Sequence, residues 1–151
     1  MKPVHTKYAS AETLIFPNAV TVNVLLSGKD TDGNQVVFED IVEPGIGPGW
    51  HIHHEQDEIF FFLEGDFIAE VAGQLMTFKA GNVAFIPRCT VHAFKNVGTT
   101  KGRLRYIFSP ALTIEGMFRE FYDSLQSAKL NAEVMAQISL KHGQEFVGPP
   151  S

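Results

Sequence analysis

Residues 49–58 read Gly49-Trp50-His51-Ile52-His53-His54-Glu55-Gln56-Asp57-Glu58 and bring three histidines and Glu58 close together in the chain. In an extended strand, successive side chains point to opposite faces. His51 and His53 therefore share one face, whereas Ile52 and His54 share the other. Glu58 follows a polar bend and can return on a neighbouring strand with its carboxylate facing the same space. Two imidazoles and a carboxylate are ligands suited to a divalent transition metal.

A third imidazole is available downstream at His92, in a pattern of strand, proline turn and strand between Gly81 and Asn96. Three neutral imidazoles and one carboxylate leave a divalent ion with a net charge of about +1 and two open octahedral positions. An anionic chelating substrate, such as an enolate or a vicinal diolate, can occupy them while the metal acts as a Lewis acid. In a competing interpretation Glu58 is a structural carboxylate and the three histidines alone bind the ion.

The composition excludes several classes of protein. The chain has 151 residues and a formal charge of 12 minus 17, or −5, with no basic run, which argues against nucleic-acid binding. Its one cysteine, Cys89, excludes an internal disulfide framework and fits a reducing compartment. No apolar run approaches the roughly 20 residues of a membrane span, and residues 1–5 lack the apolar core of a secretory signal. We predict a cytoplasmic protein with no membrane partner.

Short alternating segments dominate the chain as far as Phe108. Between them lie turn signals, including Gly28–Asn34, Glu64–Asp66 and Ala72–Gly73. Repeated short strands of this kind predict an all-β sandwich or barrel. The expected strands are Thr13–Phe16, Val20–Leu26, Gln35–Val42, Ile59–Leu63, Phe67–Val71, Gln74–Phe78, Asn82–Ile86, Val91–Val97 and Arg103–Phe108.

The pattern then changes to a helical period. Apolar residues from Ile114 to Leu125 recur on one face of a helix, for which Thr113 is the expected N-cap. A second helix is expected from an Asn131 cap to a stop near Gly143, with a non-helical tail from Phe146 to Pro150. We predict a single domain over residues 1–151, with a barrel over about 13–109 and two helices over about 113–143 packed outside it.

Two blocks of the chain resemble the paired motifs of the cupin superfamily. The first is Gly45-x5-His51-x-His53-x4-Glu58-x6-Gly65, and the second is Gly81-x5-Pro87-x-Cys89-x2-His92-x3-Asn96. They agree at every specified position except Cys89, where the superfamily has glycine. Because glycine at a turn supplies a backbone conformation that side chains disfavour, we expect the cysteine to cost some stability without removing a ligand.

The resemblance implies a double-stranded β-helix (jelly-roll) barrel. Its metal would be bound by His51, His53, Glu58 and His92, with Fe, Mn, Ni, Cu, Co and Zn all compatible. The resemblance also implies a homodimer, for which the residues before Val20 are candidates for strand exchange. The chain is similar to small cupins described as quercetinase-like, which implies a dioxygenase acting on an enolised flavonol or related diol, with Glu58 as ligand and catalytic base.

Aromatic residues near the predicted site suggest the substrate. Phe60 and Phe62 share the parity of Glu58, and Phe94 shares that of His92, so they form a candidate pocket for a small aromatic molecule. Tyr106 is a further candidate, although either Tyr106 or the flanking arginines 103 and 105 must face inward. Two alternatives stay open: a metal-dependent isomerase or lyase acting on a sugar or keto acid without redox chemistry, and a non-catalytic binding protein.

Overall fold

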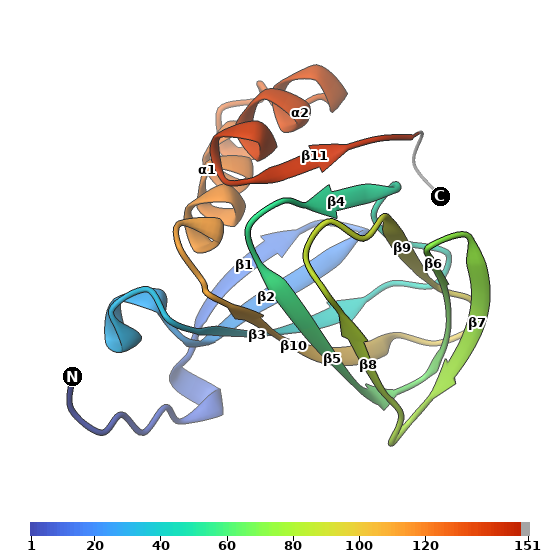
Figure 1. Cartoon of the computed structure of the whole chain (residues 1–151), viewed down its shortest axis with the longest axis horizontal. Coiled ribbons are helices and arrows are strands. Elements are labelled where there is room, and N and C mark those ends of the chain that lie inside the picture. Colours follow the sequence, from blue (N-terminus) through green and yellow to red (C-terminus); the bar gives the residue numbers. More distant parts are fainter. Residues whose placement is uncertain (149–151) are drawn as a thin grey trace.

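The computed structural model describes residues 1–148, which form two antiparallel sheets followed by two helices and a final short strand (Figure 1). Single turns of 3-10 helix occupy Tyr8–Ser10 and Gly28–Thr31. The regular elements are β1 (Glu12–Phe16), β2 (Val20–Leu26), β3 (Val36–Val42), β4 (His51–His53), β5 (Asp57–Glu64), β6 (Asp66–Val71), β7 (Gln74–Lys79), β8 (Val83–Ile86), β9 (His92–Asn96), β10 (Gly102–Ser109), α1 (Ile114–Gln126), α2 (Ala132–Lys141) and β11 (Gln144–Phe146).

The two sheets form the barrel that the strand pattern predicts. One sheet has the strand order β1-β2-β3-β10-β5-β8, and the other has the order β11-β4-β9-β6-β7. Consecutive strands β4 and β5 lie in different sheets, so the chain crosses the barrel between His53 and Asp57. Strand β1 pairs with β2 of the same chain, and the homodimer stays a prediction. No helix within residues 1–148 is long and apolar enough to cross a membrane.

Strand β10 shows how alternation builds the core. Leu104, Tyr106 and Phe108 are buried at every second position, as the two-residue period of a strand requires. Arg103 and Arg105 point the other way, and both form ion pairs with Glu39 on the neighbouring strand β3. The question left open by the sequence is thereby answered, because Tyr106 is the inward residue.

The helices lie outside the sheets, as predicted, and α1 also closes one end of the barrel (Figure 1). The ring of Phe118 on α1 lies 4.9 Å from that of Phe38 and 6.5 Å from that of Tyr106 (centroid distances). Asn131 caps α2 as expected, its Oδ1 accepting a hydrogen bond from Val134 N at 2.9 Å. Thr113 does not cap α1 with its side chain, because its hydroxyl is hydrogen-bonded instead to Nδ1 of His142.

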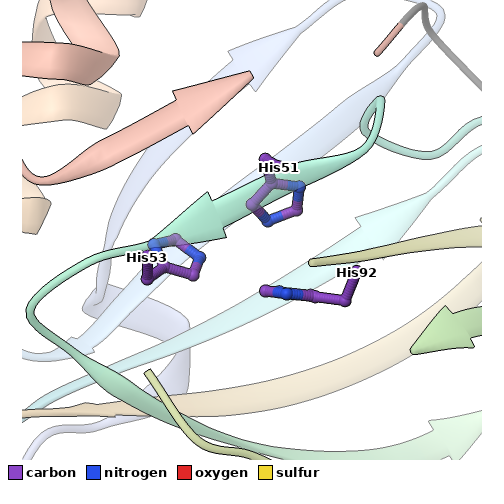
Figure 2. A group of neighbouring side chains, drawn as sticks. All are labelled: His51, His53 and His92. Atoms are coloured by element: carbon purple, nitrogen blue, oxygen red, sulfur yellow. The ribbon is translucent and has the colours of Figure 1, made fainter. Parts of the chain in front are cut away.

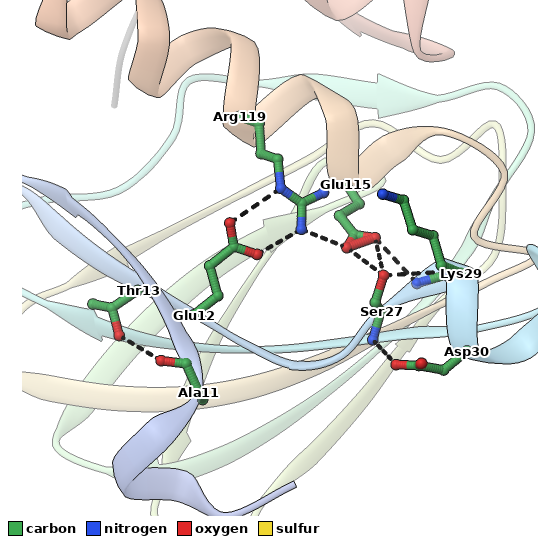
Figure 3. Close-up of polar contacts among 9 residues, drawn as sticks. Ala11, Glu12, Thr13, Ser27, Lys29, Asp30, Glu115 and Arg119 are labelled. Carbon is green, nitrogen blue, oxygen red and sulfur yellow. Dashed lines mark hydrogen bonds and ion pairs between the residues drawn. The ribbon is translucent and has the colours of Figure 1, made fainter. Parts of the chain in front are cut away.

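Polar contacts fasten α1 to the first strands of the barrel (Figure 3). Arg119 forms ion pairs with Glu12 on β1, at 2.6 Å, and with Glu115 one helical turn earlier, at 2.9 Å. Glu115 in turn accepts hydrogen bonds from the hydroxyl of Ser27 and from the backbone N–H of Gly28. The network fixes the helix against the barrel wall.

The tail from Phe146 is non-helical as far as it is described, as predicted, but its first residue belongs to strand β11, which was not predicted. Gly143, with φ of +79°, ends α2 and turns the chain back, and β11 then pairs antiparallel with β4. A strand of three residues is too short to show an alternating pattern, which is why the sequence did not reveal it. The last part of that predicted tail, residues 149 and 150, lies outside the described residues.

Phe38 joins the barrel to the helical segment, so its truncation should destabilise both. It is fully buried and its ring contacts those of Tyr106, Phe108 and Phe118. We expect Phe38→Ala to lower the free energy of unfolding by about 3–5 kcal/mol, measured by urea denaturation. Phe85→Ala is the control, because Phe85 is 60% exposed and its loss should cost less than about 0.5 kcal/mol. Equal losses for both variants would contradict this assignment of the core.

Candidate metal centre

Strands β4 and β9 bring three imidazoles together inside the barrel (Figure 2). His51 and His92 are direct partners in the antiparallel ladder, and His53 is on the same face of β4 as His51. All three side chains are buried. Their ring centroids are 4.3 to 5.4 Å apart, and one ligand nitrogen from each lies within 4.8 Å of the others.

Backbone carbonyls orient two of these rings. Nδ1 of His51 donates to Gly49 O, and Nδ1 of His92 donates to Thr90 O, each at 2.9 Å. A carbonyl oxygen only accepts hydrogen bonds, so both Nδ1 atoms carry the proton. In that tautomer the opposite nitrogen, Nε2, has a free lone pair. A carbonyl partner on the second nitrogen is the usual arrangement for a metal-binding histidine.

Glu58 approaches the histidines from the opposite sheet, so the prediction that it returns on a strand neighbouring theirs was wrong. After the chain crosses the barrel, Glu58 is the first inward residue of β5. Its Oε1 lies 3.5 Å from His92 Nε2, and its Oε2 lies 3.6 Å from His53 Nε2. Two ligand atoms bound to one ion at about 2.1 Å are about 3.0–3.4 Å apart, so these separations are close to those of a shared ion.

Several of these atoms are buried without a hydrogen-bond partner among the described residues. They are both ring nitrogens of His53, Nε2 of His92 and Oε1 of Glu58. A buried polar atom left unpaired costs about 1–3 kcal/mol, so native proteins seldom leave several in one place. A divalent cation can accept one lone pair from each imidazole and from the carboxylate, which would leave, of these atoms, only the N–H of His53 without a partner. The buried cluster of His51, His53 and His92 is consistent with a metal site, and the donor set does not distinguish among transition metals.

Electrostatics keep His51 and His53 in the neutral, ligand form, whereas the effect of burial on His92 is outweighed by contact with Glu58, so the pKa of His92 is raised. Burial, followed by the nearby His92, lowers the pKa of His51 to about 3. Burial also lowers the pKa of His53 well below its ordinary value. Burial raises the pKa of Glu58, although contact with His92 opposes that shift. A cation between these groups would favour the neutral imidazoles and the charged carboxylate together.

The turn before His92 holds β4 in place. It contains Cys89, the one position that departs from the superfamily motifs. Cys89 has φ of +67°, a conformation that favours glycine, which is the residue the superfamily has here. Its backbone N–H donates to the carbonyl of His53 at 2.8 Å. The cysteine thus keeps the backbone function of the glycine at some cost in strain. His54 points outward, as predicted, and pairs with Glu145.

A largely apolar cavity of about 410 Å³ lies next to the cluster, and Glu58 forms part of its wall. Of the predicted pocket residues, Phe60, Phe94 and Tyr106 line it. Phe62 does not, which corrects the prediction for that residue. Although Phe62 faces inward, it lies one inward position farther from the cluster, where the rings of Phe67 and Phe78 fill the space. Helix α1 contributes Met117, Phe118 and Phe121 to the wall, and β11 contributes Phe146.

Two polar residues of this cavity were missed from the sequence. Asp40 is buried on β3, lines the cavity and accepts a hydrogen bond from Oη of Tyr106. Asp40 alternates with Val36, Phe38 and Val42, and this pattern in the sequence could have indicated that its side chain faces inward. Gln144 lies opposite His53 in the β11–β4 ladder and faces the same cavity. No pattern in the sequence pointed to it, because β11 itself was not recognised.

Comparisons with known proteins agree with this fold. Residues 38–109 match the family model described as "Cupin domain", and the chain has a mostly β cupin fold with two antiparallel sheets and two C-terminal helices. A curated relative, an uncharacterised protein of Methanocaldococcus jannaschii, is 28% identical over 99 residues, which cover 65% of this chain and 79% of the relative.

Solved structures show the same fold. A predicted oxalate decarboxylase from Thermotoga maritima superposes with a TM-score of 0.65 at 21% identity, covering 70% of this chain and 98% of that one. The polyketide cyclase RemF from Streptomyces resistomycificus gives 0.59 at 22% identity, with 73% and 80% covered. Streptomyces PAC13 with uridine gives 0.64 at 12% identity and covers 100% of this chain and 95% of its own.

Removing one imidazole should remove the metal and leave the fold. We expect His51→Ala and His92→Ala to lower the affinity for a divalent transition metal at least roughly 100-fold, because each takes a lone pair from the cluster. Elemental analysis after dialysis against a limiting metal concentration measures the occupancy, and circular dichroism checks the fold. His54→Ala, on the outward face, should keep the wild-type occupancy. Unchanged occupancy in both cluster variants would remove the site assignment.

Asp40 should make the metal-free protein less stable as the pH rises. Burial raises the pKa of Asp40 from 3.8 to about 8, so the folded chain retains a proton that the unfolded chain releases between these values. Stability is therefore lost as the pH rises through this window. The asparagine of the Asp40→Asn variant cannot ionise. We therefore expect the unfolding free energy of this variant, relative to that of the wild type, to increase by a few kcal/mol from pH 4.5 to pH 8. Urea denaturation in the presence of a chelator tests this, and an advantage independent of pH would contradict it.

Proposed function

We propose that this protein is a metal-dependent oxidoreductase of the dioxygenase type, acting on a small aromatic substrate that chelates the metal. The observation that supports it best is the position of Glu58. This residue contacts two of the clustered imidazoles and also lines a cavity whose other walls are mostly aromatic and aliphatic. A molecule in the cavity would thus meet the metal site at the carboxylate.

His51, His53, Glu58 and His92 would hold the ion. A divalent transition metal, when bound there, supplies Lewis-acid stabilisation of a chelated enolate or diolate and, if redox-active, electron transfer to dioxygen. Glu58 is placed to accept the proton of a substrate hydroxyl, because it lines the cavity in which the substrate would lie. Gln144 offers a side-chain amide beside His53, from which it can donate a hydrogen bond to a substrate oxygen.

The cavity wall favours an aromatic body over a sugar. Phe60 and Phe94 present their rings near the cluster, with centroids 5.5 Å apart, and Phe118 closes the far side from α1. Such surfaces exclude water from the reacting atoms and stack on flat ligands. Together with the resemblance to quercetinase-like cupins, the wall makes an enolised flavonol or a related diol the first substrate class to test.

A second candidate function is metal-assisted chemistry without a redox step. The structures that share this fold include proteins named as a predicted oxalate decarboxylase and as a polyketide cyclase. The same four ligands and the same Lewis-acid role would serve an isomerisation, a decarboxylation or a ring closure. In that case dioxygen would not be consumed, and a redox-inert metal would support the reaction.

Dioxygen uptake distinguishes the two functions. The protein, reconstituted in turn with iron, manganese, nickel, copper, cobalt and zinc, is mixed with a panel of flavonols and diols in an oxygen electrode. We expect substrate-dependent uptake with a redox-active metal, and a loss of about 100-fold or more in kcat/KM for Glu58→Gln. His54→Gln is the control and should keep full activity. Equal turnover with zinc in the absence of dioxygen would favour the second function, and ligand binding without turnover would indicate a binding protein.

A further inference from the structure

A polar pair with no assigned role lies on the cavity wall away from the histidines. Asp40 on β3 and Tyr106 on β10 are 6% and 3% exposed, and both line the cavity. Oη of Tyr106 donates a hydrogen bond to Oδ1 of Asp40 at 2.9 Å. The other carboxyl oxygen, Oδ2, has no hydrogen-bond partner among residues 1–148. Because Asp40 lines the cavity, this oxygen is available to a polar group that enters it.

The strand registers separate this pair from the metal cluster. On β10, Leu104 is opposite Asp40 and Phe108 is opposite Glu58. The two carboxyl-bearing positions are therefore offset by four residues, roughly 13 Å along the strands, and β10 lies between their strands. Tyr106 stands halfway along this offset and faces the same interior. A ligand that reaches both places must carry polar groups at two ends of an apolar body.

The hydrogen-bonding capacity of the pair indicates which polar group fits. Burial raises the pKa of Asp40 to about 8, so the carboxyl is mostly neutral near pH 7. Because Oδ1 accepts from Tyr106, the proton resides on Oδ2, which then acts as a donor. Oη of Tyr106 uses its hydrogen on Asp40 and keeps a lone pair with which to accept. A hydroxyl group accepts and donates at once and so satisfies both atoms, whereas a charged group would be poorly solvated by this wall.

We propose that Asp40 and Tyr106 form a hydroxyl subsite, which binds an uncharged hydroxyl carried by the ligand at the end opposite its chelating oxygens. This inference rests on the proposed function to the extent that the metal cluster fixes the other end of the ligand. It narrows the substrate class to apolar, mostly aromatic molecules with a chelating oxygen pair and a distal hydroxyl.

Two matched probes test the subsite. One is 3-hydroxyflavone, whose neighbouring hydroxyl and keto oxygens chelate metals. The other carries one extra hydroxyl at the far end of its phenyl ring. Both are titrated by fluorescence into zinc-loaded protein without dioxygen, so that no turnover occurs. We expect the wild type to bind the hydroxylated probe about tenfold more tightly, as one buried hydrogen-bonded hydroxyl allows.

Substitutions assign the preference to the pair. Asp40→Val and Tyr106→Phe should reduce it to within about twofold. Asp40→Asn should keep most of it, because an amide still accepts from Tyr106 and donates to the ligand. Tyr122→Phe is the matched control, since Tyr122 packs on Phe16 without lining the cavity. This control should leave the preference unchanged.

Three results would overturn the subsite: equal affinity of the wild type for both probes, binding of neither probe, or an unchanged preference in both Asp40→Val and Tyr106→Phe. These results are separable from those of the proposed function. A preference that depends on the pair, without any dioxygen uptake, supports the subsite and removes the oxidative chemistry. Oxidative turnover of both probes with equal affinity supports the chemistry and removes the subsite.

Discussion

Between its two sheets this protein buries imidazole and carboxylate lone pairs that no group of the described chain satisfies. Such burial opposes folding, since each unpaired polar atom costs about 1–3 kcal/mol. The surrounding apolar core offsets that cost, and a bound cation would remove it. The local backbone serves the same arrangement: carbonyls of Gly49 and Thr90 orient two rings, and the N–H of Cys89 binds the strand that carries His53. The buried cluster of histidines and Glu58 is therefore the constraint to which the neighbouring loops conform.

The wall of the cavity is formed by Glu58 of the cluster at one end and by the helical segment at the other. Glu58 belongs to both the cluster and the cavity wall, while Phe118 on α1 packs against Phe38 and Tyr106 of the barrel. The ion pairs of Arg119 hold α1 in this position from the outside. Removal of the helices would open the apolar wall to water, so the chain uses the segment that follows the barrel to complete a site whose candidate ligands lie in the barrel.

Much of this architecture could be predicted because local signals agreed. Alternation and turn residues indicated the strands from β1 to β10, the helical period indicated α1, and the two histidine blocks indicated the cluster. The errors arose where structure depends on distant contacts. Whether Glu58 approaches from the same sheet or the opposite one follows from the crossing of the barrel, which no local pattern encodes. Phe62 has the same parity as Phe60, yet neighbours from other strands fill its surroundings. Asp40 and Gln144 are recognised as candidate site residues only once the folded chain shows that they line the cavity.

The pairing of β11 with β4 has a consequence for how the molecule is made. Strand β4 carries two of the three histidines and has three residues, with β9 on one side and β11 on the other. During synthesis the N-terminal part of a chain emerges first. Strand β4 therefore keeps one unpaired edge until residues 144–146 leave the ribosome, so the wall beside His51 and His53 is completed only after strands β5 to β10 and both helices have been synthesised.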